Sequence, residues 1–285
     1  MKKDVAVCGL FFCLFLLAGR SLDAQSGVST LRGMSLNGAT GLYAVPTART
    51  GWEKDADVGI DAGTSYNFIS ENPMIKMGIS LFHWVEITGA VDLQPEIRSN
   101  TDGVLGAKLQ FPTTKTALAI GGNIQFLRNS DYSTAHVVIH GFSQDIQFSR
   151  HKGYSTAGHI YAAATYGGEF FSWPAETTFA LGYTFVEDNR DNIDFGMGFD
   201  LLLLPDILQR FVHWIVDFSN FSYTAQPLGT DPWTRGSLNT GLRVDLAAIP
   251  VLNRFKFNID LMLLDLLDED RSIVVGLVFG LPLKR

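Results

Sequence analysis

Apolar and polar residues alternate along most of the chain after Ala56. In residues 58–68, for example, Ile60 and Phe68 share one face of an extended chain, and Asp61 lies on the other. A period of two predicts β-strands, because successive side chains of a strand point to opposite sides. Segments of about 9–13 residues with this pattern recur to the C-terminus and are separated by predicted turn-rich stretches, such as residues 128–131. The pattern predicts an all-β protein.

The number of alternating segments predicts an antiparallel sheet of about 12–14 strands. The alternation changes phase near Gly141, because Val137 and Ile139 are odd-numbered whereas Ile146 and Phe148 are even-numbered. This change predicts a bulge or an extra short strand around residues 141–150. Single-chain bacterial barrels have even strand numbers, so we expect 14 strands slightly in preference to 12.

The placement of charge distinguishes the two faces of these segments. The apolar faces carry no Asp, Glu, Lys or Arg. Such a pattern suits either a soluble sandwich with a polar exterior or a transmembrane barrel with a polar interior. In a barrel, Lys or Arg facing lipid at mid-bilayer would cost roughly 2–4 kcal/mol. The residues predicted to line the lumen of a barrel are Asp61, Lys76, Glu86, Asp92, Lys108, Asp194, Asp200, Asp217, Arg243, Asp245, Lys256 and Asp260.

The start of the chain favours the barrel over the sandwich. Positive charge, an apolar run at residues 5–19 and the small residue Ala24 predict a cleaved secretory signal peptide over residues 1–24. Cys8 and Cys13 both lie inside this run, so the exported chain has no disulfide. Aromatic residues near strand ends and a final alternating segment at 272–281 are further features of outer-membrane barrels.

We therefore expect three parts: the signal peptide at 1–24, an N-terminal segment with an entering strand at 25–56, and an outer-membrane β-barrel at 57–285. The chain has 22 Lys and Arg against 29 Asp and Glu, a net charge of −7, and no basic run, which argues against a nucleic-acid partner. The expected partners are outer-membrane lipid, the barrel-insertion machinery, and small solutes or polysaccharide. The oligomeric state stays open.

The predicted lumen has eight acids and four bases, so an open lumen would favour cations. This predicts a porin-like channel or an export-associated pore. The alternative is a closed barrel whose outer loops, such as residues 225–235, bind extracellular partners. Ion pairs across strands would close the lumen, and we expect Arg243 to pair with Asp217 or Asp260, and Lys256 to pair with Asp245. A barrel enzyme and a soluble periplasmic protein are two further hypotheses.

Candidate catalytic and metal-binding residues are few. His136 and His140 would lie about 13 Å apart along one face of a strand, which is too far to share an ion, so no metal or cofactor is expected. One loop-like stretch contains polar residues without any catalytic motif around them, so no enzyme activity is expected. These residues are Asp145, Ser149, His151 and Ser155.

One stretch resembles a known family. Residues 38–49 read GATGLYAVPTAR and residues 84–89 read WVEITG. They resemble the N-terminal motif and an early strand of YjbH-type outer-membrane proteins, and the likeness covers roughly residues 38–126. That family is linked with exopolysaccharide export, and its members are often longer and lipidated. This chain is shorter and has no cysteine placed for lipidation. Without the resemblance, residues 38–49 would be a Gly- and Pro-bearing strand that lines or caps the lumen.

Overall fold

A computed structural model of the protein describes most of the chain. It places residues 32–52, 56–69, 71–93, 101–111, 116–139, 142–186, 192–208, 211–221, 236–249, 252, 255–267 and 271–284. The predicted signal peptide at 1–24 and the predicted binding loop at 225–235 lie outside these ranges. Within them, no helix is long and apolar enough to cross a membrane.

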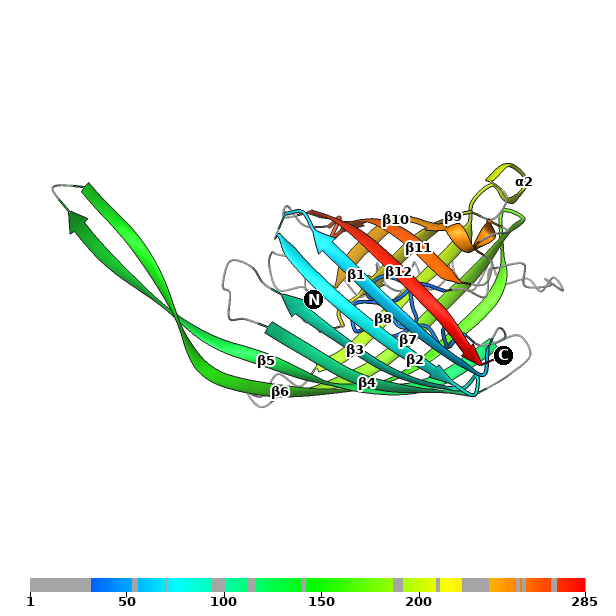
Figure 1. Ribbon diagram of the computed structural model, residues 1–285, viewed down its shortest axis with the longest axis horizontal. Coiled ribbons are helices and arrows are strands. Elements are labelled where there is room, and N and C mark those ends of the chain that lie inside the picture. Colours follow the sequence, from blue (N-terminus) through cyan, green and yellow to red (C-terminus); the bar gives the residue numbers. More distant parts are fainter. Residues whose placement is uncertain are drawn as a thin grey trace, which may run out of the picture.

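The described strands form one closed antiparallel barrel (Figure 1). Twelve strands follow one another around it in sequence order, and β1 closes it by pairing with β12. A closed sheet has no unpaired edge, as a membrane-spanning sheet requires. The predicted barrel is confirmed, with twelve strands and not fourteen. The strands are β1 (Val58–Asn67), β2 (Asn72–Leu81), β3 (Val85–Leu93), β4 (Thr101–Phe111), β5 (Thr116–Ile139), β6 (Phe142–Phe170), β7 (Trp173–Val186), β8 (Asn192–Leu202), β9 (Val212–Ser219), β10 (Ser237–Asp245), β11 (Lys256–Leu264) and β12 (Ser272–Lys284).

The strand count is lower than preferred because two strands are much longer than expected. β5 and β6 form one hairpin that extends well beyond the rest of the barrel (Figure 1). Their register shifts where Asn129 pairs with Gly153 and Ser130 pairs with His151, so Lys152 is an extra residue in β6. An extra residue reverses the alternation of the strand that contains it. The change of phase near Gly141 lies before this bulge. Ile139 pairs with Phe142 and Ala135 pairs with Ile146, so odd-numbered residues of β5 pair with even-numbered residues of β6 as the chain passes from one strand to the other. The register shift at Lys152 lies just outside the expected range of 141–150.

Two local expectations in this hairpin are wrong for the same reason. The turn-rich stretch at residues 128–131 is part of β5, and the loop-like stretch at residues 145–155 is part of β6. A run of polar residues usually predicts a turn, because a strand that packs against a core has apolar residues on one face. These parts of β5 and β6 pair with each other beyond the barrel wall, so the rule does not apply to them. His136 lies in β5, whereas His140 falls outside the described residues.

The links between strands define the two rims of the barrel. Phe82–Trp84 join β2 to β3, Phe171 and Ser172 join β6 to β7, α2 (Pro205–Leu208) lies between β8 and β9, and the 3-10 helix η2 (Leu246–Ala248) lies between β10 and β11. All these links share one rim with the start of β1 and the end of β12. We call it the short-link rim. The β5–β6 hairpin extends from the opposite rim (Figure 1).

Apolar side chains cover the outside of the barrel, and polar side chains face inward. On β11, Leu261 is 51% exposed and the residue before it, the inward-facing Asp260, is 6% exposed. The same alternation holds for the other strands whose side chains are described, with exposed Ile120 and Ile124 on β5 and Leu277 and Phe279 on β12. An apolar exterior of this extent is solvated by lipid, because a soluble protein would expose it to water.

Changing Leu261 to Arg tests this assignment. We expect Leu261→Arg to lower the free energy of unfolding from a bilayer by roughly 2–4 kcal/mol, since a guanidinium would face lipid near the middle of β11. The urea dependence of heat-modifiable gel mobility would measure the change. Leu261→Phe is the matched control and should leave the midpoint nearly unchanged. Equal midpoints for the two variants would contradict a lipid-facing position.

Candidate functional site

The structure places the side chains of the twelve predicted lumen residues inside the barrel. Eleven of these residues are 6% exposed or less, and the side chain of Asp200 is 13% exposed. Glu176 on β7 also faces inward and is 4% exposed. It is absent from the residues predicted to line the lumen. The alternation in fact continues back to Glu176, so the signal was present in the sequence.

A segment of the chain itself fills the interior. Every residue from Arg32 to Trp52 is buried, and we call residues 32–52 the plug. The plug folds through its own turns: the N–H of Gly41 donates to the carbonyl of Gly33 (3.0 Å), and the N–H of Leu42 donates to the carbonyl of Val45 (3.0 Å). It contains two isolated β-bridges and no longer strand. The barrel therefore has an occupied lumen.

Gly38 shows how closely the plug approaches the wall. Its φ of +82° is a conformation that residues with a Cβ rarely adopt. A Cβ at this position would lie 2.5 Å from the carbonyl oxygen of Gly89 on β3 and 3.2 Å from that of Met77 on β2. Only glycine fits there, which accounts for the first residue of the GATG sequence.

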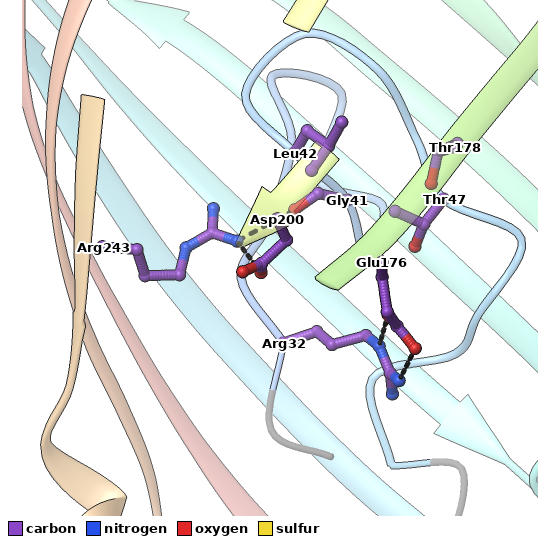
Figure 2. Close-up of a pocket in the computed structure, with 8 residues that line it drawn as sticks. All are labelled: Arg32, Gly41, Leu42, Thr47, Glu176, Thr178, Asp200 and Arg243. Atoms are coloured by element: carbon purple, nitrogen blue, oxygen red, sulfur yellow. Dashed lines mark hydrogen bonds and ion pairs between the residues drawn. The ribbon is translucent and has the colours of Figure 1, made fainter. Parts of the chain in front are cut away.

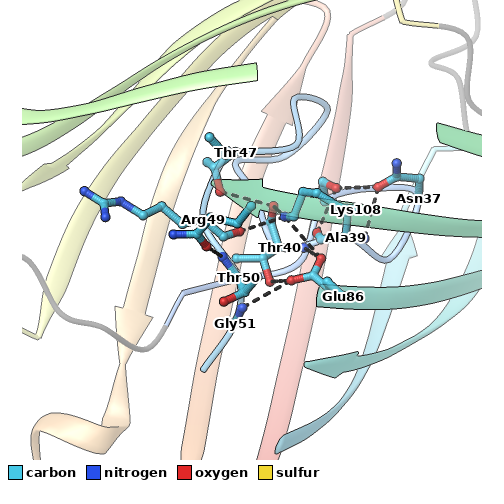
Figure 3. A network of polar contacts seen from close by, with 12 residues as sticks. Asn37, Ala39, Thr40, Thr47, Arg49, Thr50, Gly51, Glu86 and Lys108 are labelled. Atoms are coloured by element: carbon cyan, nitrogen blue, oxygen red, sulfur yellow. Dashed lines mark hydrogen bonds and ion pairs between the residues drawn. The ribbon is translucent and has the colours of Figure 1, made fainter. Parts of the chain in front are cut away.

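Glu86 on β3 holds the middle of the plug (Figure 3). Its carboxylate accepts hydrogen bonds from the N–H (2.7 Å) and hydroxyl (2.6 Å) of Thr40 and from the N–H of Gly51 (3.2 Å). Lys108, opposite on β4, lies 3.2 Å from Glu86 and donates to the carbonyls of Thr40 (3.2 Å) and Arg49 (2.7 Å). One ion pair of the wall thus binds both the donors and the acceptors of the plug backbone.

Glu176 joins the two ends of the plug. The guanidinium of Arg32 donates to both oxygens of its carboxylate, at 3.0 and 2.8 Å, and Nε of Arg49 lies 3.3 Å from one of them (Figure 2 shows the Arg32 pair). Asp200 lies directly opposite Glu176 on β8. Two carboxylates in register repel each other, so the plug arginines neutralise a site where the wall alone has excess negative charge. We call this arrangement the Glu176 clasp.

Asp200 also has partners in the wall. Nδ1 of His213 lies 2.6 Å from its carboxylate, and Nη1 of Arg243 lies 4.0 Å away. Arg243 donates to both oxygens of Asp260 on the facing strand, at 2.7 and 3.0 Å, which confirms one of the two expected pairings. The same guanidinium donates to the carbonyl of Gly41 in the plug (3.2 Å).

Asp217 on β9 binds the apolar part of the plug. Its Oδ2 accepts from the N–H groups of Tyr43 and Ala44, both at 2.7 Å, and its Oδ1 accepts from the amide of Asn239 (2.7 Å). Burial and the nearby carboxylates raise the pKa of the Tyr43 phenol, so the ring stays neutral. The ammonium of Lys76 lies 5.7 Å from the centre of this ring, within the range of a cation–π interaction.

Trp52 anchors the end of the plug that leads into β1. Its indole N–H donates to Asp61 (2.9 Å), and Lys256 donates to the other oxygen of Asp61 (2.8 Å) while lying 5.1 Å from the indole ring. The expected pair of Lys256 with Asp245 is wrong. Gly280 pairs in register with both Asp61 and Lys256, so no side chain on β12 separates them.

The charges of the wall and the plug are complementary. Together with Glu176, the described wall residues named above comprise nine carboxylates and four Lys or Arg. The plug contains Arg32 and Arg49 and no acidic residue. Among the residues that the structure describes, no group of three or more His, Cys, Asp or Glu is arranged to hold a metal ion.

A closed sheet with an apolar exterior and a charged interior is the form in which a β-sheet spans a membrane. The protein is an integral β-barrel of the bacterial outer membrane. No protein-family model matches the sequence, and no curated protein matches it.

Solved structures with similarity to this barrel are outer-membrane proteins at low sequence identity. The chain is similar to the outer-membrane protein Omp33 of Acinetobacter baumannii, at 9% identity and a TM-score of 0.40, over 80% of this chain and 98% of that one. Similarity to the β domain of the Bordetella autotransporter BrkA has 8% identity and a TM-score of 0.41, with the same coverage. OprD of Pseudomonas aeruginosa matches at 12% identity and a TM-score of 0.32, over 92% of this chain and 74% of that one. The assignment to the membrane rests on the barrel geometry, since these likenesses are weak.

Proposed function

We propose that this protein is a cation-preferring outer-membrane channel that the plug closes and that opens when the plug leaves the lumen. The observation that carries the proposal is the complementarity of an acid-rich wall and an acid-free segment of the same chain. The Glu176 clasp, Glu86 and Asp217 bind the plug through ion pairs and hydrogen bonds. Water can replace these polar contacts, whereas the apolar side chains that the plug packs against the wall, such as Leu42 and Val45, become exposed to water on opening.

The two ends of the plug differ in a way that suits a gate. The Trp52 end is fixed to the wall and continues into β1, whereas the Arg32 end is held by the Glu176 clasp near the short-link rim. Movement of the Arg32 end away from Glu176 would uncover Glu176 and Asp200, and the release of Thr40 would uncover one side of Glu86. A passage lined by these carboxylates would concentrate cations and repel anions.

Strain at Gly38 provides the first test. We expect Gly38→Val to raise the ratio of open to closed channel roughly ten- to hundredfold, because the left-handed φ alone costs a β-branched residue about 1–3 kcal/mol in the closed state. Planar-bilayer recording of the purified full-length protein would measure the open probability. The reversal potential in a KCl gradient should show preference for K⁺.

Gly103→Val is the matched control, since a Cβ at Gly103 meets only Phe126 at an ordinary 3.8 Å. It should behave as the unchanged protein. A Gly38→Val protein that folds with heat-modifiable mobility and gives no current would reject the gated channel. An anion-selective current would reject the role assigned to the carboxylates.

A second candidate function is the binding of extracellular partners by the β5–β6 hairpin. β4 pairs with β5 only as far as Phe126, and β7 pairs with β6 only from Ala157 onward, so in the described structure the distal parts of both strands pair with each other alone. Removal of residues 131–150 should leave barrel folding intact and abolish adhesion of cells to immobilised extracellular proteins. Unchanged adhesion would exclude this function.

The resemblance to YjbH-type proteins supports a proposal about ancestry. Residues 38–49, which carry the motif, form most of the plug. We propose that the chain is a short relative of that family, in which the motif closes the barrel.

A further inference from the structure

The lumen wall binds part of the plug through its backbone. Carboxylate oxygens of Glu86 and Asp217 accept hydrogen bonds from the N–H groups of Thr40, Tyr43 and Ala44. Neutral wall residues continue the series, since Gln110 accepts from the N–H of Thr50 (2.8 Å) and Thr165 accepts from the N–H of Ala48 (2.8 Å). Every peptide has such N–H groups, so these contacts would be available to other polypeptides.

Side chains of the plug enter spaces that the wall leaves open. A Cβ at Gly198 on β8 would lie 2.6 Å from Cδ1 of Leu42, and one at Gly196 would lie 2.8 Å from Cγ2 of Val45. These two glycines therefore form sockets for short aliphatic side chains, and Glu176 forms a socket for guanidinium groups. The wall thus has a backbone-binding surface with side-chain pockets, which is the general form of a peptide-binding site.

Charge restricts which peptides can bind there. Nine carboxylates outnumber four bases in the wall, and an acidic side chain beside Glu86, Glu176, Asp200 or Asp217 would bring like charges together, which is unfavourable when they are buried. The plug satisfies this restriction, because its 21 residues from Arg32 to Trp52 include two arginines and no acid.

From these contacts we infer that the lumen is a binding site for cationic peptides without acidic residues, and that the plug is its resident ligand. The inference rests on the proposed function in one respect only, namely that the plug can leave the lumen. While it is tethered, the plug is present at an effective concentration of about millimolar, so a free peptide cannot compete. Release of the tether would let a peptide from solution take its place.

The experiment uses the full chain, folded in detergent, with a specific protease site inserted after Lys54. Cleavage is verified by the mass of the fragments after denaturation. A fluorescently labelled synthetic peptide of residues 32–52 is then added, and its anisotropy reports entry into the barrel. We expect saturable binding after cleavage and at least tenfold weaker binding before it. Absence of binding to the cleaved barrel would overturn the inference.

The matched control is the same peptide with Arg32→Glu and Arg49→Glu. It should bind roughly a hundredfold more weakly, because it brings two acids to the Glu176 clasp. Equal binding of the two peptides would overturn the charge restriction. A second route needs no cleavage: the full-length Gly38→Val protein, whose own plug is strained, should bind the labelled peptide more tightly than the unchanged protein, and equal affinities would contradict the inference.

These measurements do not depend on current through a bilayer. Peptide binding without conductance would reject the channel and keep the peptide site. Conductance without peptide binding would reject the peptide site and keep the channel.

Discussion

Glu176→Gln is expected to raise the open probability of the channel by roughly two to three powers of ten. The substitution removes the buried carboxylate that Arg32 and Arg49 share. Breaking one side of a buried ion pair costs about 3–5 kcal/mol, and each 1.4 kcal/mol changes an equilibrium tenfold. The penalty falls on the closed state alone, because both arginines regain water when the plug leaves. Single-channel recording would measure it.

Glu169→Gln is the matched control. Glu169 lies on β6 near the same rim but is exposed, so its loss should not change the gating. If Glu176→Gln and Glu169→Gln proteins opened equally often, the Glu176 clasp would have no role in closing the lumen, and the gate would have to reside elsewhere in the plug.

Lys256→Met is expected to produce the largest loss of stability. It removes the ammonium from Asp61 and leaves that buried carboxylate with the indole N–H of Trp52. We expect the free energy of unfolding to fall by about 3–5 kcal/mol. The midpoint of urea unfolding, followed by heat-modifiable gel mobility in lipid vesicles, would report the change.

The double variant Asp61→Asn with Lys256→Met separates the pair from the packing. It removes both charges, and it should recover most of the stability lost in Lys256→Met, since no buried charge is left unpaired. A double variant as unstable as the single one would show that Lys256 acts through its contact with the Trp52 ring and not through its charge.

Most of the fold could be predicted from the sequence, since strand alternation is a local property. The outward and inward faces of β1 and β11 follow directly from the order of residues such as Ile60, Asp61 and Asp260. The strand count is harder to predict, because the alternation changes phase where β5 passes into β6 and Ile139 pairs with Phe142, which imitates an extra strand. The numbering pattern alone does not distinguish the turn of a long hairpin from a bulge or an added strand.

The contents of the lumen could not be derived in the same way. The sequence predicts that residues 38–49 line or cap the lumen. That they fill it depends on the shape of the closed barrel. Contacts such as Tyr43 with Asp217, or Arg32 with Glu176, join residues more than 140 positions apart. Pairings of this kind depend on which strands become neighbours. Lys256 shows the difficulty, since its partner Asp61 is reached only across Gly280 of a third strand.

The contacts of Trp52 have a consequence for assembly. Its indole meets Asp61 on the first strand and Lys256 on the eleventh, beside Gly280 on the twelfth. No partly formed sheet contains all of these neighbours, because they come together only when the first strand pairs with the last. The emission of this tryptophan, in a variant with the other four replaced by phenylalanine, would therefore mark the moment at which the cylinder is complete.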